Sequence, residues 1–343
     1  MPVRFSESVV ITRAIVRTAV RAGADEAQLL AAASLDPLVM TDADGRVPAW
    51  TNKVLIEEAV RLTGDDALGV HAGEWLQPDP SNLFWFIFVN CANLGEGAEK
   101  VQSYYRLLSD AVWPLLEVDE REARCVMGTV IAVPVWPRHL TECCLSIWTS
   151  MMFKLVGGRF PLREVRMQHP RPEDVSVHEG FFRCPLRFDQ PRNEIAFDWE
   201  MLELPNSQAD PHLGEALRRF AELKLHDVGP RDVFLDGVRR VLAEALHGGD
   251  SSLAAVSARM GMSARTLQRR LEEREVNYRE LVDTLRRELA GSYLRDPAVS
   301  ISELAFMMGF GDLTAFYRAF RRWYNTTPAG YRRTALELAA ADD

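Results

Sequence analysis

The chain has 343 residues, of which 47% are apolar and 26% are charged. This length suits two domains better than one, and the composition excludes wholesale disorder because each domain can bury an apolar core. The formal net charge of −9, taken alone, argues against a partner that is a polyanion such as DNA.

The longest dense apolar run, residues 83–89, has seven residues, far fewer than the roughly 20 that a membrane helix needs. Arg13 and Arg17 interrupt the apolar stretch at the N-terminus, so no signal peptide is predicted. We therefore expect a cytoplasmic protein that makes no contact with a membrane.

Residues 1–228 are predicted to form an α+β domain. Apolar residues recur every three or four positions in the helical segments, and short apolar runs between turn residues predict strands. The expected helices are 9–22, 53–62, 96–109, 140–156 and 213–225, and the expected strands are 113–118, 123–131, 162–168 and 194–198. Helices followed by a β-β-α-β order favour a mainly antiparallel sheet.

The apolar run 83–89 is unusually bulky. It is expected to be a buried helix or strand of the domain core. An alternative is that three of its rings wall an apolar pocket for a hydrophobic effector, and these are Trp85, Phe86 and Phe88.

The five cysteines form no CxxC pair, so we expect reduced, mostly buried thiols. His169, His178, Glu179 and Cys184 lie close together in the sequence, but their spacing fits no standard zinc pattern. A structural role is expected for them. The sequence predicts no catalytic residue, no metal site and no cofactor.

Residues 229–343 are predicted to be helical throughout, and they contain an internal repeat. The stretch that begins at Ser257 (Ser-Ala-Arg-Met-Gly-Met) matches the stretch that begins at Ala305 (Ala-Phe-Met-Met-Gly-Phe). In each copy a small residue allows two helices to cross closely, and a glycine four positions later supplies the positive φ of a short turn. The repeat predicts two helix-turn-helix units, at about residues 252–274 and 300–323.

The second helix of each unit is expected to begin at an N-cap, Ser263 in one and Asp312 in the other. Leu267 and Leu271 should face inward in the first unit, as Phe316 and Phe320 should in the second. The opposite faces are then free to enter the major groove, where arginine can form two hydrogen bonds with guanine and glutamine can do so with adenine. The predicted base-reading residues are Arg265, Gln268, Arg269, Thr314, Tyr317 and Arg318, and the predicted phosphate contacts are Ser263, Arg270, Arg274, Arg321 and Arg322.

The charge distribution agrees with this prediction. Residues 252–333 contain 14 arginines, no lysine and nine acidic residues, a net charge of +5, so the remainder of the chain carries −14. Such asymmetry indicates that one part meets a polyanion. The alternative is a solvated helix face on which Glu272 and Glu273 balance the arginines.

The two units are joined by an unbroken helical pattern over residues 278–295. Eighteen helical residues span about 27 Å. A rod of this length is expected to hold the two recognition helices about one turn of DNA apart, roughly 34 Å.

The segments that start at Met262 (Met-Ser-Ala-Arg-Thr-Leu-Gln-Arg-Arg-Leu), Gly309 (Gly-Phe-Gly-Asp-Leu-Thr-Ala-Phe-Tyr-Arg-Ala-Phe-Arg-Arg-Trp) and Thr327 (Thr-Pro-Ala-Gly-Tyr-Arg) resemble the AraC/XylS family of transcription regulators. The resemblance implies a seven-helix DNA-binding domain whose base contacts come from the base-reading residues named above. Three positions depart from the family pattern: Ser257 replaces alanine, Leu313 replaces a polar residue, and Asn325 replaces glycine.

The segments around Glu164–His169, Phe182–Phe188 and Asn193–Pro205 resemble the effector domain of the family branch described as arabinose-binding-like. The predicted order of elements does not suggest the jelly-roll barrel of a sugar sensor, so arabinose is not inferred as the effector. The resemblance implies a domain that binds a small-molecule effector and offers a surface for a homodimer.

The leading hypothesis is a sequence-specific DNA-binding transcription regulator under effector control. The family more often activates, which favours an activator that contacts RNA polymerase. Two alternatives are an enzyme-like N-terminal domain fused to a DNA-binding domain, and a protein-interaction module with vestigial helix-turn-helix units. The working unit, one chain or two, stays open.

Overall fold

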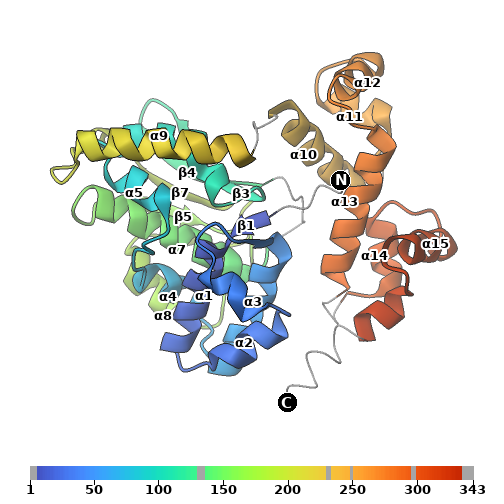
Figure 1. Ribbon diagram of the computed structural model, residues 1–343, viewed down its shortest axis with the longest axis horizontal. Coiled ribbons are helices and arrows are strands. Elements are labelled where there is room, and N and C mark those ends of the chain that lie inside the picture. The colour runs from blue at the N-terminus through green and yellow to red at the C-terminus, as the bar shows by residue number, and fades with distance from the viewer. Residues whose placement is uncertain (1–5, 130–135, 229–232, 248–249, 295–298, 334–343) are drawn as a thin grey trace. The chain divides into compact units, whose positions relative to one another are not determined.

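The computed structural model describes residues 6–129, 136–228, 233–247, 250–294 and 299–333 (Figure 1). The chain forms two compact units. The N-terminal unit holds the elements from β1 (Ser6–Ser8) to α9 (Pro211–Val228), and the C-terminal unit holds those from α10 (Val233–His247) to α15 (Leu313–Tyr324). No helix in the described ranges is long and apolar enough to cross a membrane.

The first half of the N-terminal unit is mainly helical. The short strands β1 and β2 (Arg46–Pro48) pair antiparallel. The helices in chain order are α1 (Val9–Arg21), α2 (Glu26–Ala32), α3 (Ala49–Thr63), α4 (Leu68–Glu74), α5 (Leu83–Val89) and α6 (Leu94–Tyr104), with the 3-10 turns η1 (Pro37–Thr41) and η2 (Tyr105–Leu107).

A five-stranded sheet follows, in the order β3-β4-β7-β5-β6. β7 pairs antiparallel with β4 and with β5, whereas β5 and β6 run parallel. The elements are β3 (Val112–Val118), β4 (Glu122–Thr129), α7 (Arg138–Leu155), β5 (Leu162–Arg166), α8 (Ser176–Phe182), β6 (Leu186–Arg187), β7 (Glu194–Asp198) and the 3-10 turn η3 (Trp199–Glu203). Phe197 of β7 and Phe153 of α7 both pack against Phe160, which joins the sheet to α7.

The helices α4 and α7 cross almost backbone to backbone. A side chain at Gly69 would collide with the carbonyl oxygen of His139, and one at Gly73 would collide with the backbone of Ser146. The hydroxyl of Ser146 donates to the carbonyl oxygen of Gly69 at 2.9 Å. The two helices can approach this closely because neither glycine has a side chain. This close crossing fixes the first turns of α7 against α4.

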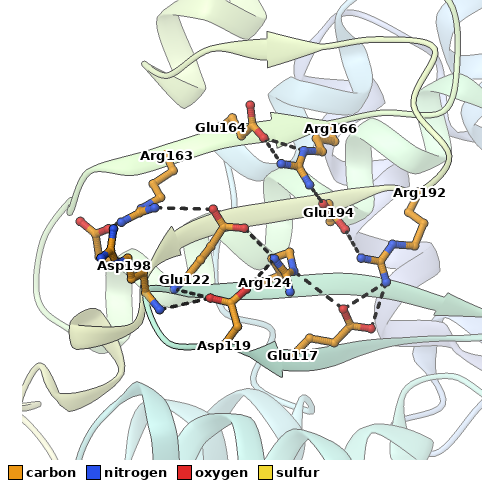
Figure 2. Close-up of polar contacts among 11 residues, drawn as sticks. Glu117, Asp119, Glu122, Arg124, Arg163, Glu164, Arg166, Arg192, Glu194 and Asp198 are labelled. Atoms are coloured by element: carbon orange, nitrogen blue, oxygen red, sulfur yellow. Dashed lines mark hydrogen bonds and ion pairs between the residues drawn. The ribbon is translucent and has the colours of Figure 1, made fainter.

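One face of the sheet carries a network of arginines and carboxylates, drawn in Figure 2. Arg124 of β4 contacts Glu122 at 2.9 Å and Asp119 at 3.0 Å, and Arg192 contacts Glu117 of β3 at 3.0 Å. The pairs Arg163–Asp198 and Arg166–Glu194 continue the network across β5 and β7. Antiparallel sheets commonly bury one face and leave the other polar, and opposite charges across strands support the pairing.

The C-terminal unit is helical in all its described elements. Between α10 and α15 these are α11 (Leu253–Arg259), α12 (Ala264–Glu272), α13 (Tyr278–Tyr293) and α14 (Ile301–Met307). Residues 328–333 are helical as well, which completes the seven helices that the family resemblance implies. In Figure 1, α11 and α12 lie at one end of α13, and α14 and α15 lie toward its other end.

The predicted fold class is confirmed: a helical and mainly antiparallel N-terminal unit precedes an all-helical one. Several boundaries were wrong, among them the start of the helix expected at 53–62, which begins at Ala49. The helix expected to reach residue 109 gives way at Tyr105 to the 3-10 turn η2, and the strand expected to reach residue 168 ends at Arg166. The rod expected over 278–295 ends at Tyr293, so it spans 16 residues, and Arg295 lies outside the described ranges. The boundary predicted near 228 falls just before 229–232, which are also outside them.

Candidate nucleic-acid interface

Each predicted helix-turn-helix unit is present. Gly261 follows α11 with a φ of +68°, and Gly309 follows α14 with a φ of +71°. Both values lie in the left-handed region, which glycine adopts without steric cost. The two predicted turns are thus confirmed, and each redirects the chain into a second helix.

The second helices α12 and α15 begin at the predicted N-caps. The Ser263 hydroxyl accepts a hydrogen bond from the Thr266 amide at 3.1 Å, and the Asp312 carboxylate accepts one from the Ala315 amide at 2.7 Å. Asn325 ends α15 with a φ of +54°, a conformation that asparagine tolerates in place of the family's glycine.

Burial decides which face of each helix is free. Leu267 and Leu271 of α12 are buried, as are Phe316 and Phe320 of α15. Because a helix turns 100° per residue, residues on the side opposite each buried pair point away from the core, as the exposed Arg269 and Arg318 do. Both helices therefore present the faces that the sequence assigned to DNA.

On α12 the predicted base-reading residues Arg265, Gln268 and Arg269 are exposed. The amide of Gln268 donates to Glu272 at 3.0 Å, and Arg269, 66% exposed, pairs with Glu273 at 3.1 Å. Exposed ion pairs of this kind are weak. Such weak contacts leave both side chains available to another partner, such as a phosphate or a guanine edge.

Two predicted phosphate contacts, Arg270 of α12 and Arg274 just after it, stack on a ring of α10. The guanidinium groups of Arg270 and Arg274 lie over the ring of Phe234, 5.4 Å and 4.7 Å from its centroid. This aromatic platform was missed by the sequence analysis, because nothing in the local pattern pairs position 234 with positions 270 and 274. Cation–π stacking leaves guanidinium edges able to donate.

On α15 the predicted residues Thr314, Arg318 and Arg321 are exposed, and Tyr317 is half-buried with its ring edge-on to Phe316. Leu313, which departs from the family pattern, is an exposed apolar residue at the start of the helix. An apolar side chain there contributes no hydrogen bond to a base edge.

Arg322 of α15, 64% exposed, pairs with Asp283 of α13 at 2.5 Å. The indole nitrogen of Trp323 donates to the same carboxylate at 2.9 Å. Asp283 therefore ties the last turn of α15 to α13. Arg322 was predicted to contact phosphate, whereas no contact was predicted for Asp283. Ser263, whose hydroxyl caps α12, is exposed at the start of that helix.

In the N-terminal unit, residues 83–89 form the buried helix α5. A cavity of about 50 Å³ lies beside it, and its lining includes Phe84, Phe88, Tyr105 and Trp148. Trp85 and Phe86 are not among its lining residues. Of the three rings predicted to wall an effector pocket, Phe88 alone lines this cavity.

A second cluster in this unit surrounds the fully buried carboxylate of Glu142. Arg138 donates to its Oε1 at 2.8 Å, and Nε2 of His178 lies 2.8 Å from the same atom. Nε2 of His169 lies 3.7 Å from Oε1, and Nδ1 of His139 lies 3.6 Å from Oε2. Burial alone would raise the pKa of Glu142, but its contacts with His139, His178 and Arg138 hold that pKa well below its usual value.

Of the four residues that lie close together in the sequence, the structure brings together two, His169 and His178. They meet at Glu142, which was not part of that group. Glu179 is instead exposed and lies near Arg171. Burial raises the pKa of Cys184 to about 11. Within the described ranges, no group of histidine, cysteine and acidic residues has the geometry to hold a metal ion. The five cysteines form no disulfide in these ranges.

Two family models match the chain. The model of the N-terminal arabinose-binding domain of AraC transcription regulators matches residues 23–206, and a helix-turn-helix domain model matches residues 256–334. One match lies in each unit.

Several named regulators are similar in sequence. The ornithine utilization regulator of Pseudomonas aeruginosa is 27% identical over 97% of this chain and 96% of its own length. VirS of Mycobacterium tuberculosis is 26% identical over 71% of this chain and 72% of its own, and the transcriptional activator NphR of a Rhodococcus species is 31% identical over 37% of each. Among solved structures, the regulator CdpR of Pseudomonas aeruginosa covers 92% of this chain and 97% of its own, at 22% identity and a TM-score of 0.41.

The Glu142 cluster predicts that acid destabilises the N-terminal unit. The pKa of Glu142 is lowered on folding, so its contribution is present above its unfolded pKa of about 4.5 and is lost as the pH falls below that value. Burial lowers the pKa of His169 from about 6.5, so stability is also lost as protons bind the unfolded chain below that pH. We expect Glu142→Gln to lower the free energy of unfolding by about 3 kcal/mol at pH 7, because it removes the buried carboxylate that Arg138 and His178 contact and leaves Arg138 only its ion pair with the exposed Asp66.

The measurement is urea denaturation at pH 7 and pH 4, followed by tryptophan fluorescence, since seven of the eight tryptophans precede residue 229. Glu142→Gln should lose less stability than the wild type between the two pH values. Glu179→Gln is the matched control, because the same change there removes an exposed carboxylate. Equal pH dependence in the wild type and Glu142→Gln would refute this assignment.

Proposed function

Because the chain belongs to the AraC family of transcription regulators, we propose that it activates transcription from DNA sites that α12 and α15 read in successive major grooves. The family assignment gives an N-terminal effector-binding domain and a helix-turn-helix DNA-binding domain. The observation that carries the proposal is the pair of exposed faces on α12 and α15, each opposite a buried apolar pair.

The proposed roles of individual residues follow from exposure and chemistry. Arg265, Gln268 and Arg269 on α12, with Thr314, Tyr317 and Arg318 on α15, read base edges. The hydroxyl of Ser263 and the guanidinium groups of Arg270, Arg274, Arg321 and Arg322 contact phosphates, which fix the register of the protein on the duplex. The net charge of +5 over residues 252–333 supports this division.

An activating role and a contact with RNA polymerase are supported by the names of NphR and of PerA of Escherichia coli, both described as transcriptional activators. Such a protein acts where the bacterial chromosome lies, in the cytoplasm. The similar proteins are named as transcription regulators, which disfavours the alternative of an enzyme-like N-terminal domain.

The DNA-binding proposal predicts different effects for two arginines. DNA that the purified protein selects from a random library provides the specific duplex. Arg269→Ala should weaken binding to it by about 1–3 kcal/mol and relax the preference at one base position. Arg322→Ala should weaken specific and random duplexes alike, and should reduce the slope of log affinity against log salt by about one.

Titrations at several salt concentrations measure both effects. Equal loss on specific and random DNA for Arg269→Ala would remove its base-reading role. Placed upstream of a promoter, the selected duplex should give more run-off transcript with bacterial RNA polymerase when the protein is added. A decrease in transcript would contradict the activating role.

We infer that the effector is a small apolar molecule bound beside Phe88, in the cavity between α5, α6, α7 and the sheet. The lining is almost entirely apolar and aromatic, which suits such a ligand. At about 50 Å³ the cavity is small, but Met151 and Met152 also line it, and methionine side chains repack at low cost. Trp85 and Phe86 lie on the same helix but do not line the cavity.

Benzene serves as the probe, since apolar cavities bind it. We expect millimolar benzene to raise the thermal midpoint of the N-terminal unit in the wild type and to have no such effect on Ala98→Leu, which fills the cavity. Ala31→Leu, a matched change at an exposed site on α2, should respond like the wild type. An equal response of Ala98→Leu would reject this site.

We also infer that the working unit is a homodimer joined through α9, the yellow helix in Figure 1. Gly214 and Ala221 face the unit, whereas Leu213, Ala216, Phe220 and Leu223 are exposed on the opposite side. Their spacing of three, four and three residues is that of a coiled-coil seam, which fits another helix better than solvent.

Leu223 is 68% exposed, and Leu223→Glu should raise the dimer dissociation constant at least about tenfold, because a charge in an apolar seam is costly to bury. Sedimentation equilibrium measures the constant. Leu38→Glu introduces the same charge at a leucine that is 72% exposed on η1, and should leave association unchanged. A monomeric wild type, or equal effects of the two variants, would exclude the α9 interface.

A further inference from the structure

α13 is the element that both helix-turn-helix units share. Tyr278, in its first turn, donates its hydroxyl proton to the carbonyl oxygen of Ser251 at 2.9 Å, just before the first unit begins. Asp283 accepts from Arg322 and Trp323 of the second unit. The hydroxyl of Tyr324 donates to the carbonyl oxygen of Arg287 at 2.7 Å. α13 therefore holds each unit by separate polar contacts.

One side chain on α13, that of Arg286, reaches both units at once. Its Nη2 donates to the hydroxyl of Ser251 at 3.3 Å and to the carbonyl oxygen of Gly309 at 3.4 Å. Ser251 precedes the first helix-turn-helix unit, and Gly309 is the turn glycine of the second. Its guanidinium group also lies over the ring of Phe310, 4.8 Å from the centroid.

This environment leaves the guanidinium little freedom. Its Nε is buried and has no hydrogen-bond partner among the residues the structure describes. Burial lowers the pKa of Arg286, and the nearby Asp283 and Tyr278 partly offset that effect. A charge desolvated in this way depends on the contacts it keeps, because losing them leaves a buried donor unpaired. The side chain is thus held between the two units and is not a solvated surface arginine.

We propose that Arg286 is a positioning residue that sets the separation of the two recognition helices, and hence the spacing between the two half-sites that one chain accepts on DNA. A single guanidinium group that bonds to the start of the first unit and to the turn of the second couples their positions. A change in either position breaks one of its contacts. The inference rests on the proposed function, since spacing has meaning only for a protein that reads two grooves.

The test uses the full chain and the duplex selected from a random library by the wild type. Derivatives of this duplex carry one or two base pairs inserted or deleted between the half-sites. The wild type should bind the selected spacing more tightly than the altered spacings. Arg286→Met keeps the apolar stem over Phe310 but removes both hydrogen bonds. It should lower that preference about tenfold, the usual worth of a hydrogen bond from a charged group.

Arg279→Met is the matched control, because Arg279 is an exposed arginine on the first turn of the same helix. It removes the same charge and should retain the spacing preference. If circular dichroism shows that Arg286→Met does not fold, Ser251→Ala is tested in its place. This variant removes one of the two hydrogen-bond acceptors of Arg286 and should lower the spacing preference to a smaller extent.

Weaker binding of Arg286→Met by one factor at every spacing would overturn the inference, because it would reflect stability alone. An unchanged preference in Arg286→Met, or in Ser251→Ala where that variant decides, would overturn it as well. These results would leave the proposed function intact. Failure of the wild type to select any duplex would instead refute the proposed function, and the positioning role with it.

Discussion

The C-terminal unit depends on the burial of two apolar side chains in each recognition helix. Leu267 with Leu271, and Phe316 with Phe320, stand four residues apart and must face the core, because exposing either pair would cost several kcal/mol. That single requirement sets the rotation of α12 and α15 about their own axes. Residues on the opposite faces, such as Gln268, Arg269 and Arg318, then point outward, so the face offered to DNA is a consequence of core packing.

What could be predicted from the sequence was local or periodic. The turn glycines, the N-caps at Ser263 and Asp312, and the buried pairs each depend on residues within about ten positions of one another, and all were confirmed. Contacts between distant segments carry no such signal. Glu142, which lies near His169 and His178, is on α7, a helix that packs closely against the glycines of α4. The spacing of residues within 139–178 does not reveal this packing.

The cavity beside α5 illustrates the same limit within one short helix. Trp85, Phe86 and Phe88 were grouped because they are bulky neighbours, but successive residues of a helix point 100° apart. Phe84 and Phe88, four positions apart, share the face that borders the cavity, while Trp85 and Phe86 turn to other neighbours. Treating residues 83–89 as a definite helix would have selected Phe84 with Phe88. The prediction had left helix and strand open, and so could not choose a face.

Contacts along α13 constrain how an effector can control DNA binding. Asp283 and Arg286 tie both helix-turn-helix units to one helix, so changing the position of one unit alone would break polar contacts that are partly buried. Moving the C-terminal unit as a whole therefore requires less free energy than moving either recognition helix alone. Under the proposed function, this favours control by a shift in population between states: the effector would bind one state more tightly, and the whole C-terminal unit would reach DNA in that state.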